Sequence, residues 1–176
     1  MAGGNPELFE QIKPFLKHLA NNIIYMGAIG TGHATKSLNH FVFATTYAAV
    51  SEALVVGAKV GPDPTKLTAA FNFSSARSWA SEDRVPNFLL KRDFGPRGGM
   101  TMELMAKDLA TACDDGRQYE IHMPLPNMMH QLMMQEVSEL GNKAANTSIT
   151  KLYKKWAGIR LNETLVPSSG VGVNIH

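Results

Sequence analysis

The sequence is poor in cysteine and has almost no excess of charge. Its 176 residues include one cysteine, Cys113, which excludes an internal disulfide and fits a reducing compartment. The formal net charge is +2, and basic and acidic residues are interspersed, so no nucleic-acid footprint is visible. No apolar run has the length of a membrane span, and no signal peptide is present. We therefore predict a cytoplasmic protein that binds neither nucleic acid nor a membrane.

Several catalytic motifs are also missing. The six histidines are scattered, without an HExxH motif or a cluster of histidine and cysteine, so we predict no metal site. No serine stands in a GxSxG motif. Cys113 lies inside a helical pattern, which is more typical of a core residue than of a nucleophile.

The stretch from Gly27 to Ala58 organises the chain. It opens with three glycines, Gly27, Gly30 and Gly32, and then runs without glycine or proline to Gly57. That length predicts a helix of seven or eight turns, as a rough figure. Most other positions in it are small, and small residues let neighbouring backbones approach closely. We expect a buried central helix.

The rest of the chain also shows helical spacing. Asn5 and Pro6 form an N-cap followed by a first-turn proline, and Asp63 caps a helix that starts at Pro64. Residues 23–26 are typical of a short strand. The prediction is an all-α fold with one small β remnant and an aperiodic tail at 161–176. The other predicted helices cover 5–20, 64–72, 101–119, 124–141 and 147–157, with short helical turns through 75–92.

The start of the central helix carries the candidate site. Lys36, Asn39 and His40 stand at i, i+3 and i+4, so they share one face. The free N–H groups of Gly30-Thr31-Gly32 favour an anion such as a carboxylate. Burial of Lys36 among small residues would favour the neutral amine, which suits acid–base work on an alcohol or carbonyl whose oxygen Asn39 or His40 would hold. The plainer alternative is a solvated lysine on a helix end.

A dinucleotide fingerprint is a weaker explanation of these glycines. Their order is GxxGxG rather than GxGxxG. No second strand follows with an acidic residue at its end, because Glu52 lies within the long helix.

Taken together, several short blocks resemble the β-hydroxyacid dehydrogenases, the family of 3-hydroxyisobutyrate dehydrogenase and tartronate semialdehyde reductase. Residues 30–39 match its GxGxxxKxxN motif. The resemblance covers roughly residues 3–158. Its further blocks, in the family's order, are Ser51-Glu52-Ala53-Leu54, Gly61-Pro62-Asp63-Pro64, Arg77-Ser78-Trp79 and Leu104-Met105-Ala106-Lys107-Asp108-Leu109.

The resemblance implies roles for single residues. Lys36 would be the catalytic lysine, and Lys107 would contact the nicotinamide cofactor, although Lys107-Asp108 by itself is more often a solvated helix pair. Asn39 would help to bind the substrate. The family often has Asn or Gln where His40 stands and an aromatic where Met100 stands, so substrate identity is open.

The resemblance also implies a domain organisation. Residues 1–28 look like the end of a Rossmann NAD(P)-binding domain, 29–160 like the all-helical catalytic and dimerisation domain, and 161–176 like a flexible tail. The cofactor site for NAD or NADP would then be incomplete in this chain. A helical half without its neighbour exposes apolar surface, so we expect a homodimer or a higher homo-oligomer.

The leading hypothesis is therefore the C-terminal domain of an NAD(P)-dependent 3-hydroxy-acid dehydrogenase. It would convert a short 3-hydroxy acid to its semialdehyde, or the reverse, with little activity as an isolated chain. A non-catalytic helical dimerisation module derived from the same family is the alternative. An imine-reductase-like enzyme ranks third.

Overall fold

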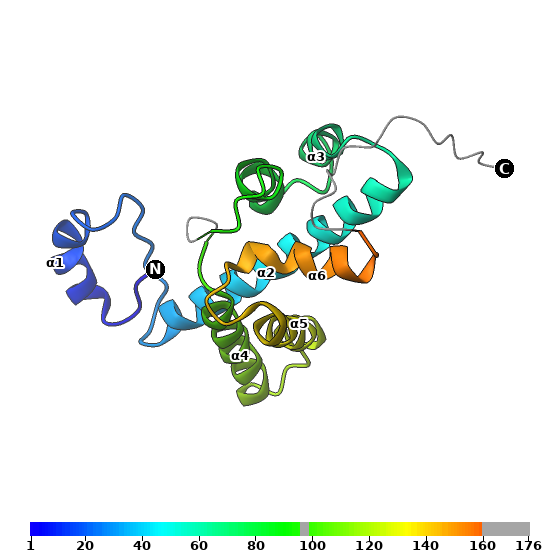
Figure 1. Cartoon of the computed structure of the whole chain (residues 1–176). Coiled ribbons are helices and arrows are strands. Elements are labelled where there is room, and N and C mark those ends of the chain that lie inside the picture. The colour runs from blue at the N-terminus through cyan, green and yellow to red at the C-terminus, as the bar shows by residue number, and fades with distance from the viewer. Residues whose placement is uncertain (96–98, 160–176) are drawn as a thin grey trace.

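One long helix runs through the molecule (Figure 1). The computed structural model describes residues 1–95 and 99–159, and in it α2 spans Thr31–Val60, 30 residues. It begins after Gly30 and ends before Gly61, whose φ angles are 92° and 119°. Such left-handed angles favour glycine, because a side chain would strain the backbone there. The predicted central helix and its break are confirmed.

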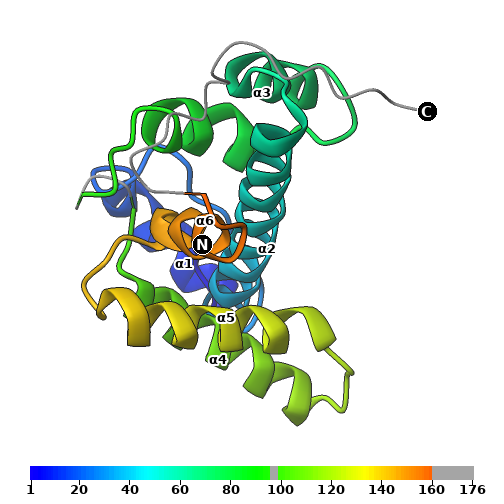
Figure 2. The same ribbon diagram turned by 45° about the vertical axis from the view of Figure 1, so that its right-hand side comes forward.

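Four further α-helices pack around α2. Figure 2 shows α4 and α5 crossing near the start of α2, with α3 beside its end. The caps follow the sequence: Asp63 accepts from the N–H of Thr65 and Lys66, and Thr101 accepts from that of Leu104. The predicted helices therefore exist, with ends shifted by a few residues. Their bounds are α3 Pro64–Asn72, α4 Met102–Gln118, α5 Pro124–Leu140 and α6 Ile149–Trp156, the last preceded by a short 3₁₀ turn, η3 Asn146–Ser148.

The core lies where α2, α4, α5 and α6 meet. Methionines fill much of it, since unbranched thioether side chains fit irregular gaps between helices. The fully buried apolar side chains include Leu54, Met102, Met105, Leu109, Met129, Met133, Ile149 and Leu152.

The segment 75–92 is more regular than predicted. In place of separate short turns it holds a ten-residue π-helix, η1, Ala80–Leu89. Pro86 lies inside η1 and has no N–H to bond the carbonyl of Ser81, five residues earlier. Asn72 donates to that carbonyl instead, at 3.2 Å. A side chain from α3 thus satisfies the acceptor that the proline leaves open.

The N-terminal segment contains a helix but no strand among its described residues. α1, Pro6–Leu16, starts after Asn5, whose side chain accepts from Leu8 N at 2.9 Å, as predicted. The predicted strand at 23–26 is wrong: a single parallel bridge joins Ala2 to Tyr25. The bridge has two hydrogen bonds, of 2.9 and 2.8 Å, and no third segment lies beside it to extend a ladder within the described chain.

α2 corrects the statement that no apolar run has the length of a membrane span, while the absence of membrane binding stays a prediction. By length and apolar composition alone it could cross a bilayer, with a mean hydropathy of 1.5 over its most apolar window. This evidence is weak, because the core helix of a soluble protein passes the same test, and α2 packs against α3, η1, α4, α5 and α6. The predicted tail at 161–176 lies outside the described residues.

Candidate functional site

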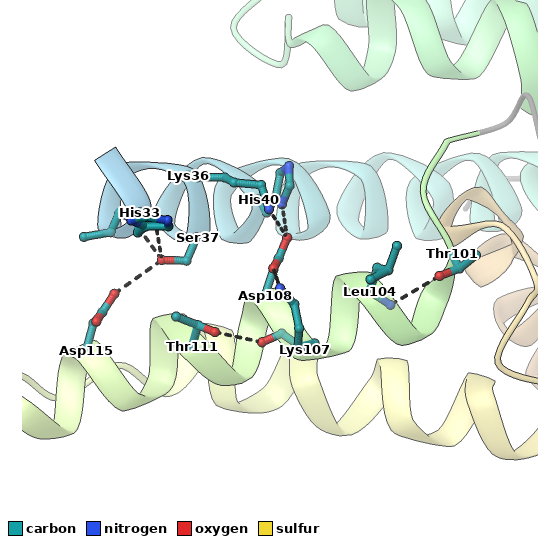
Figure 3. Close-up of polar contacts among 11 residues, drawn as sticks. His33, Lys36, Ser37, His40, Thr101, Leu104, Lys107, Asp108, Thr111 and Asp115 are labelled. Carbon is teal, nitrogen blue, oxygen red and sulfur yellow. Dashed lines mark hydrogen bonds and ion pairs between the residues drawn. The ribbon is translucent and has the colours of Figure 1, made fainter. Parts of the chain in front are cut away.

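Three basic side chains converge on one carboxylate, that of Asp108 on α4 (Figure 3). Lys36 donates to Oδ2 of Asp108 at 3.1 Å. Nδ1 of His40 lies 2.5 Å from the same oxygen, and Nζ of Lys107 lies 2.6 Å from Oδ1. An ionised carboxylate only accepts hydrogen bonds, so His40 donates through Nδ1. Both carboxylate oxygens are therefore occupied by charged or polar donors.

The helices place these groups. Lys36 and His40 are one turn apart on α2, so both reach the same point on α4. Asp108 lies on the buried side of α4, beside Met105 and Leu109, and its side chain is 5% exposed. Packing of α4 against α2 thus delivers a carboxylate to the predicted lysine face.

The contacts determine the charge of Asp108. Burial raises the pKa of this carboxyl, but hydrogen bonds from Lys107, His40 and Lys36 outweigh burial and lower the pKa to about 2. Asp108 is therefore a carboxylate at neutral pH.

The predicted environment of Lys36 is wrong in one respect. Its side chain is 53% exposed, so it does not lie among apolar small residues. The buried small residues, among them Ala44, Ala48 and Ser51, lie farther along α2, whereas Lys36 lies near its start and contacts α4 through the tip of its side chain. The amine is therefore ion-paired with Asp108 rather than enclosed by apolar side chains.

Asp108 is the residue that the sequence analysis missed. The interpretation of Lys107-Asp108 as a solvated pair holds for Lys107, 62% exposed, and is wrong for Asp108. A signal was available, because Asp108 stands three residues after Met105 and four before Ala112, on the buried face of its helix. An acidic residue on such a face needs a partner.

The glycine-rich start of α2 borders a cavity of about 560 Å³, lined by Gly30, Gly32, His33 and Lys36 together with residues 1–3. Gly32 allows a close approach of the N-terminal segment: a Cβ there would lie 3.3 Å from Gly3 N and from Met1 O. The hydroxyl of Thr31 donates to Ala28 O at 2.7 Å and is already used. Of the predicted anion-binding groups, the structure thus brings Gly30 and Gly32 together with Lys36.

Asn39 and His40 line a different cavity, of about 510 Å³, that continues along α2. It extends past Phe43 to Trp79 and Met100. His40 therefore contacts Asp108 through one ring nitrogen and also lines this second cavity. The predicted substrate residues line two cavities, and Lys36 of the first and His40 of the second both contact Asp108.

Metal ligands do not gather at this site. In residues 1–95 and 99–159 no group of three or more His, Cys, Asp or Glu side chains is arranged to hold a metal ion. A metal-free site stays a prediction.

These observations define a class of protein. It is a helical domain in which an ion-paired lysine lies beside the glycine-rich start of a long helix. Residues 30–153 match the family model described as "NAD-binding of NADP-dependent 3-hydroxyisobutyrate dehydrogenase". The match covers well over half of the chain, and the chain belongs to this family. The predicted family and the predicted nicotinamide cofactor, NAD or NADP, are confirmed at this level.

Individual relatives agree with the family. The chain is 38% identical over 136 residues to a probable mitochondrial 3-hydroxyisobutyrate dehydrogenase of Dictyostelium discoideum, covering 75% of the chain and 42% of the relative. It is 28% identical over 162 residues to 2-(hydroxymethyl)glutarate dehydrogenase of Eubacterium barkeri, covering 92% and 53%. Both relatives are hydroxy-acid dehydrogenases by name.

A solved structure shows the same fold. Mycobacterium tuberculosis 3-hydroxyisobutyrate dehydrogenase with L-serine superimposes with a TM-score of 0.78 at 26% identity, over 85% of this chain and 53% of that chain. The chain thus spans about half the length of the relatives it matches. The predicted all-α class is confirmed for the described residues, while the predicted domain boundaries stay predictions.

Proposed function

We propose that this chain is the helical, lysine-bearing part of an NAD(P)-dependent dehydrogenase that acts on a short 3-hydroxy acid. The observation that carries the proposal is the position of Lys36, which lines the cavity at the glycine-rich start of α2 and is paired with Asp108 at 3.1 Å. An amine beside a site for a carboxylate is what proton transfer on a hydroxy acid requires. The confirmed family supports the same chemistry.

In this proposal the chain's own residues bind and move a proton. The N–H of Gly32 and the positive end of α2 hold the substrate carboxylate. Lys36, as the neutral amine, takes the hydroxyl proton during oxidation, and the ammonium returns it during reduction. Asp108 stabilises the ammonium once the proton has been taken, since it is already hydrogen-bonded to Nζ. The nicotinamide cofactor, when bound, supplies hydride acceptance or donation.

Lys107 fits a cofactor contact. Its side chain is 62% exposed, and its ammonium is held 2.6 Å from Asp108 Oδ1. An exposed ammonium group that is held in one position by an ion pair can bind an anionic or carbonyl group of the cofactor. Within the described residues this is the one predicted cofactor contact, so the proposed cofactor site needs further residues.

Kinetics of Lys36→Met test the acid–base role, in a preparation of the protein that turns over a hydroxy acid with NAD or NADP. Methionine keeps most of the volume and removes the proton acceptor, so the fold should survive. General acid–base groups contribute about a hundred- to ten-thousand-fold, and we expect a loss of this size in kcat. Lys59→Met, an exposed lysine in the last turn of the same helix, is the matched control. Lys36→Met with more than about a tenth of wild-type kcat would contradict the assignment.

A second proposal, a helical dimerisation module, rests on an apolar stripe along α2. Leu38, Val42, Val56 and Val60 lie on about the same side of α2 and are 41–68% exposed. Exposed apolar side chains gathered on one side of a helix are typical of an interface. We infer that two copies of the chain pair through the Val56–Val60 end of this stripe, because Val42 at the other end lines the 510 Å³ cavity and has to stay open for substrate.

A further inference from the structure

The geometry points to a second anion subsite in the 510 Å³ cavity beside Asn39. This subsite selects 3-hydroxy acids that carry a second negative group, and Arg84 binds that group. This inference rests on the proposed function, because it describes the far end of the same substrate. It concerns which hydroxy acid binds and leaves the proton transfer at Lys36 unchanged.

The cavity adjoins the lysine site. Asn39 and His40 line its near end, and His40 shares the Asp108 oxygen that Lys36 contacts. Phe43, Trp79 and Arg84 lie farther along. The Lys36 amine lies beside His40, because both contact Oδ2 of Asp108, and His40 is three residues before Phe43, roughly 4.5 Å along the axis. A substrate whose hydroxyl is at Lys36 and whose chain continues for a few carbons therefore extends towards Arg84.

Arg84 is held in position as an anion receptor. Its guanidinium stacks over Trp79, 4.2 Å from the ring centroid, and over Phe88, 4.8 Å from the centroid. Its side chain is 18% exposed, and Nε pairs with Asp83 at 3.3 Å. A guanidinium fixed by stacking loses little freedom on binding, and its two terminal nitrogens match a carboxylate.

The lining of the cavity contains a polar atom without a partner. Oδ1 of Asn146 accepts no hydrogen bond in the part of the chain that is described, although the residue is 5% exposed. Gly99, at φ 129°, lies against it: a Cβ there would be 2.7 Å from Oδ1. An orphaned buried acceptor is costly unless a ligand donates to it. Oδ1 of Asn146 therefore suits a donor such as a substrate hydroxyl or a bound water, while the second negative group pairs with Arg84 and not with this oxygen.

The selectivity can be measured with two ligands that differ in one charge. The probes are 3-hydroxyhexanedioate and its 6-monoamide, which have the same length and the same hydroxyl. Titration calorimetry on the 176-residue chain should show tighter binding of the dianion by about ten- to a hundredfold, the range for a charge-assisted pair. Arg84→Gln should abolish this preference, and Arg84→Lys, which keeps the charge and loses the fork, should retain only part of it.

Arg77→Gln is the matched control, because Arg77 is 67% exposed, pairs with Glu82 and does not line the cavity. Its preference for the dianion should equal that of the wild type. Equal affinity of the wild type for both probes, no binding of the dianion, or an unchanged preference in a folded Arg84→Gln protein would each overturn the inference. Failure of the acid–base proposal can be told apart from failure of this inference. It would appear as retained turnover in Lys36→Met, whatever the affinities for the dianion and the monoamide are.

Discussion

Asp108→Asn should destabilise the chain in a way that depends on pH. The substitution keeps the shape of the side chain and removes the charge that Lys36, His40 and Lys107 share. The pKa of Asp108 falls from 3.8 to about 2 on folding, against the raising effect of burial. At about 1.4 kcal/mol per unit, this difference is worth about 2.5 kcal/mol of stability.

The direction of the pH effect follows from the sign of that shift. A carboxyl with a lowered pKa in the folded state stabilises the fold above its unfolded pKa, near pH 4, and the contribution is lost as the pH falls through 2. Urea unfolding of the two proteins between pH 7 and pH 2 measures the difference. We expect the free energy of unfolding of Asp108→Asn to be about 2.5 kcal/mol lower than that of the wild type at pH 7 and nearly equal to it at pH 2.

The control is Asp114→Asn on the same helix, whose side chain is 68% exposed and pairs with Arg117. It should change stability much less, because exposed ion pairs contribute little. Equal stability of Asp108→Asn and the wild type at pH 7 would refute the reasoning. A deficit that stays constant down to pH 2 would show instead that packing, not the charge, is responsible.

Three further outcomes are expected. Glu136 is fully buried, neither oxygen has a partner in the described chain, and burial raises its pKa to about 9. The folded state therefore keeps a proton on Glu136 that the unfolded state loses above pH 4.5, which makes the wild type less stable as the pH rises. Urea unfolding should show that Glu136→Gln is more stable than the wild type by up to about 3 kcal/mol at pH 7 and by less at pH 5. Lys107→Ala should raise the KM for NAD or NADP with little change in kcat; a kcat loss as large as that of Lys36→Met would contradict a pure binding role. Light scattering should show that the wild type is at least a dimer, and Val56→Lys in the apolar stripe of α2 should shift the equilibrium towards the monomer. A stable wild-type monomer at high concentration would contradict pairing through the stripe.

Local features of the sequence predicted the helices well. The caps at Asn5 and Asp63 and the glycines around α2 act through hydrogen bonds and φ angles within a few residues, so the sequence is enough to find them. The same holds for Lys36 and His40, whose shared face follows from helical spacing alone. The family resemblance, built from such short blocks, was confirmed.

Features that depend on distant partners were harder to predict. The bond from Asn72 to Ser81 allows a π-helix through Pro86, and no local rule indicates it. Asp108 meets Lys36 across 72 positions, so the exposure and charge pairing of the lysine depend on how α4 lies against α2. Small residues on a helix predict close packing, but they do not say which turn is covered.

The meeting of residues 1–3 with the first turn of α2 has a practical consequence. Met1, Ala2 and Gly3 line the same cavity as Lys36. Any polypeptide joined to Met1, whether a purification tag or a folded domain, therefore leaves the chain at the rim of the lysine cavity. We expect a short tag there to compete with substrate for space, and a domain attached without a long linker to cover the amine.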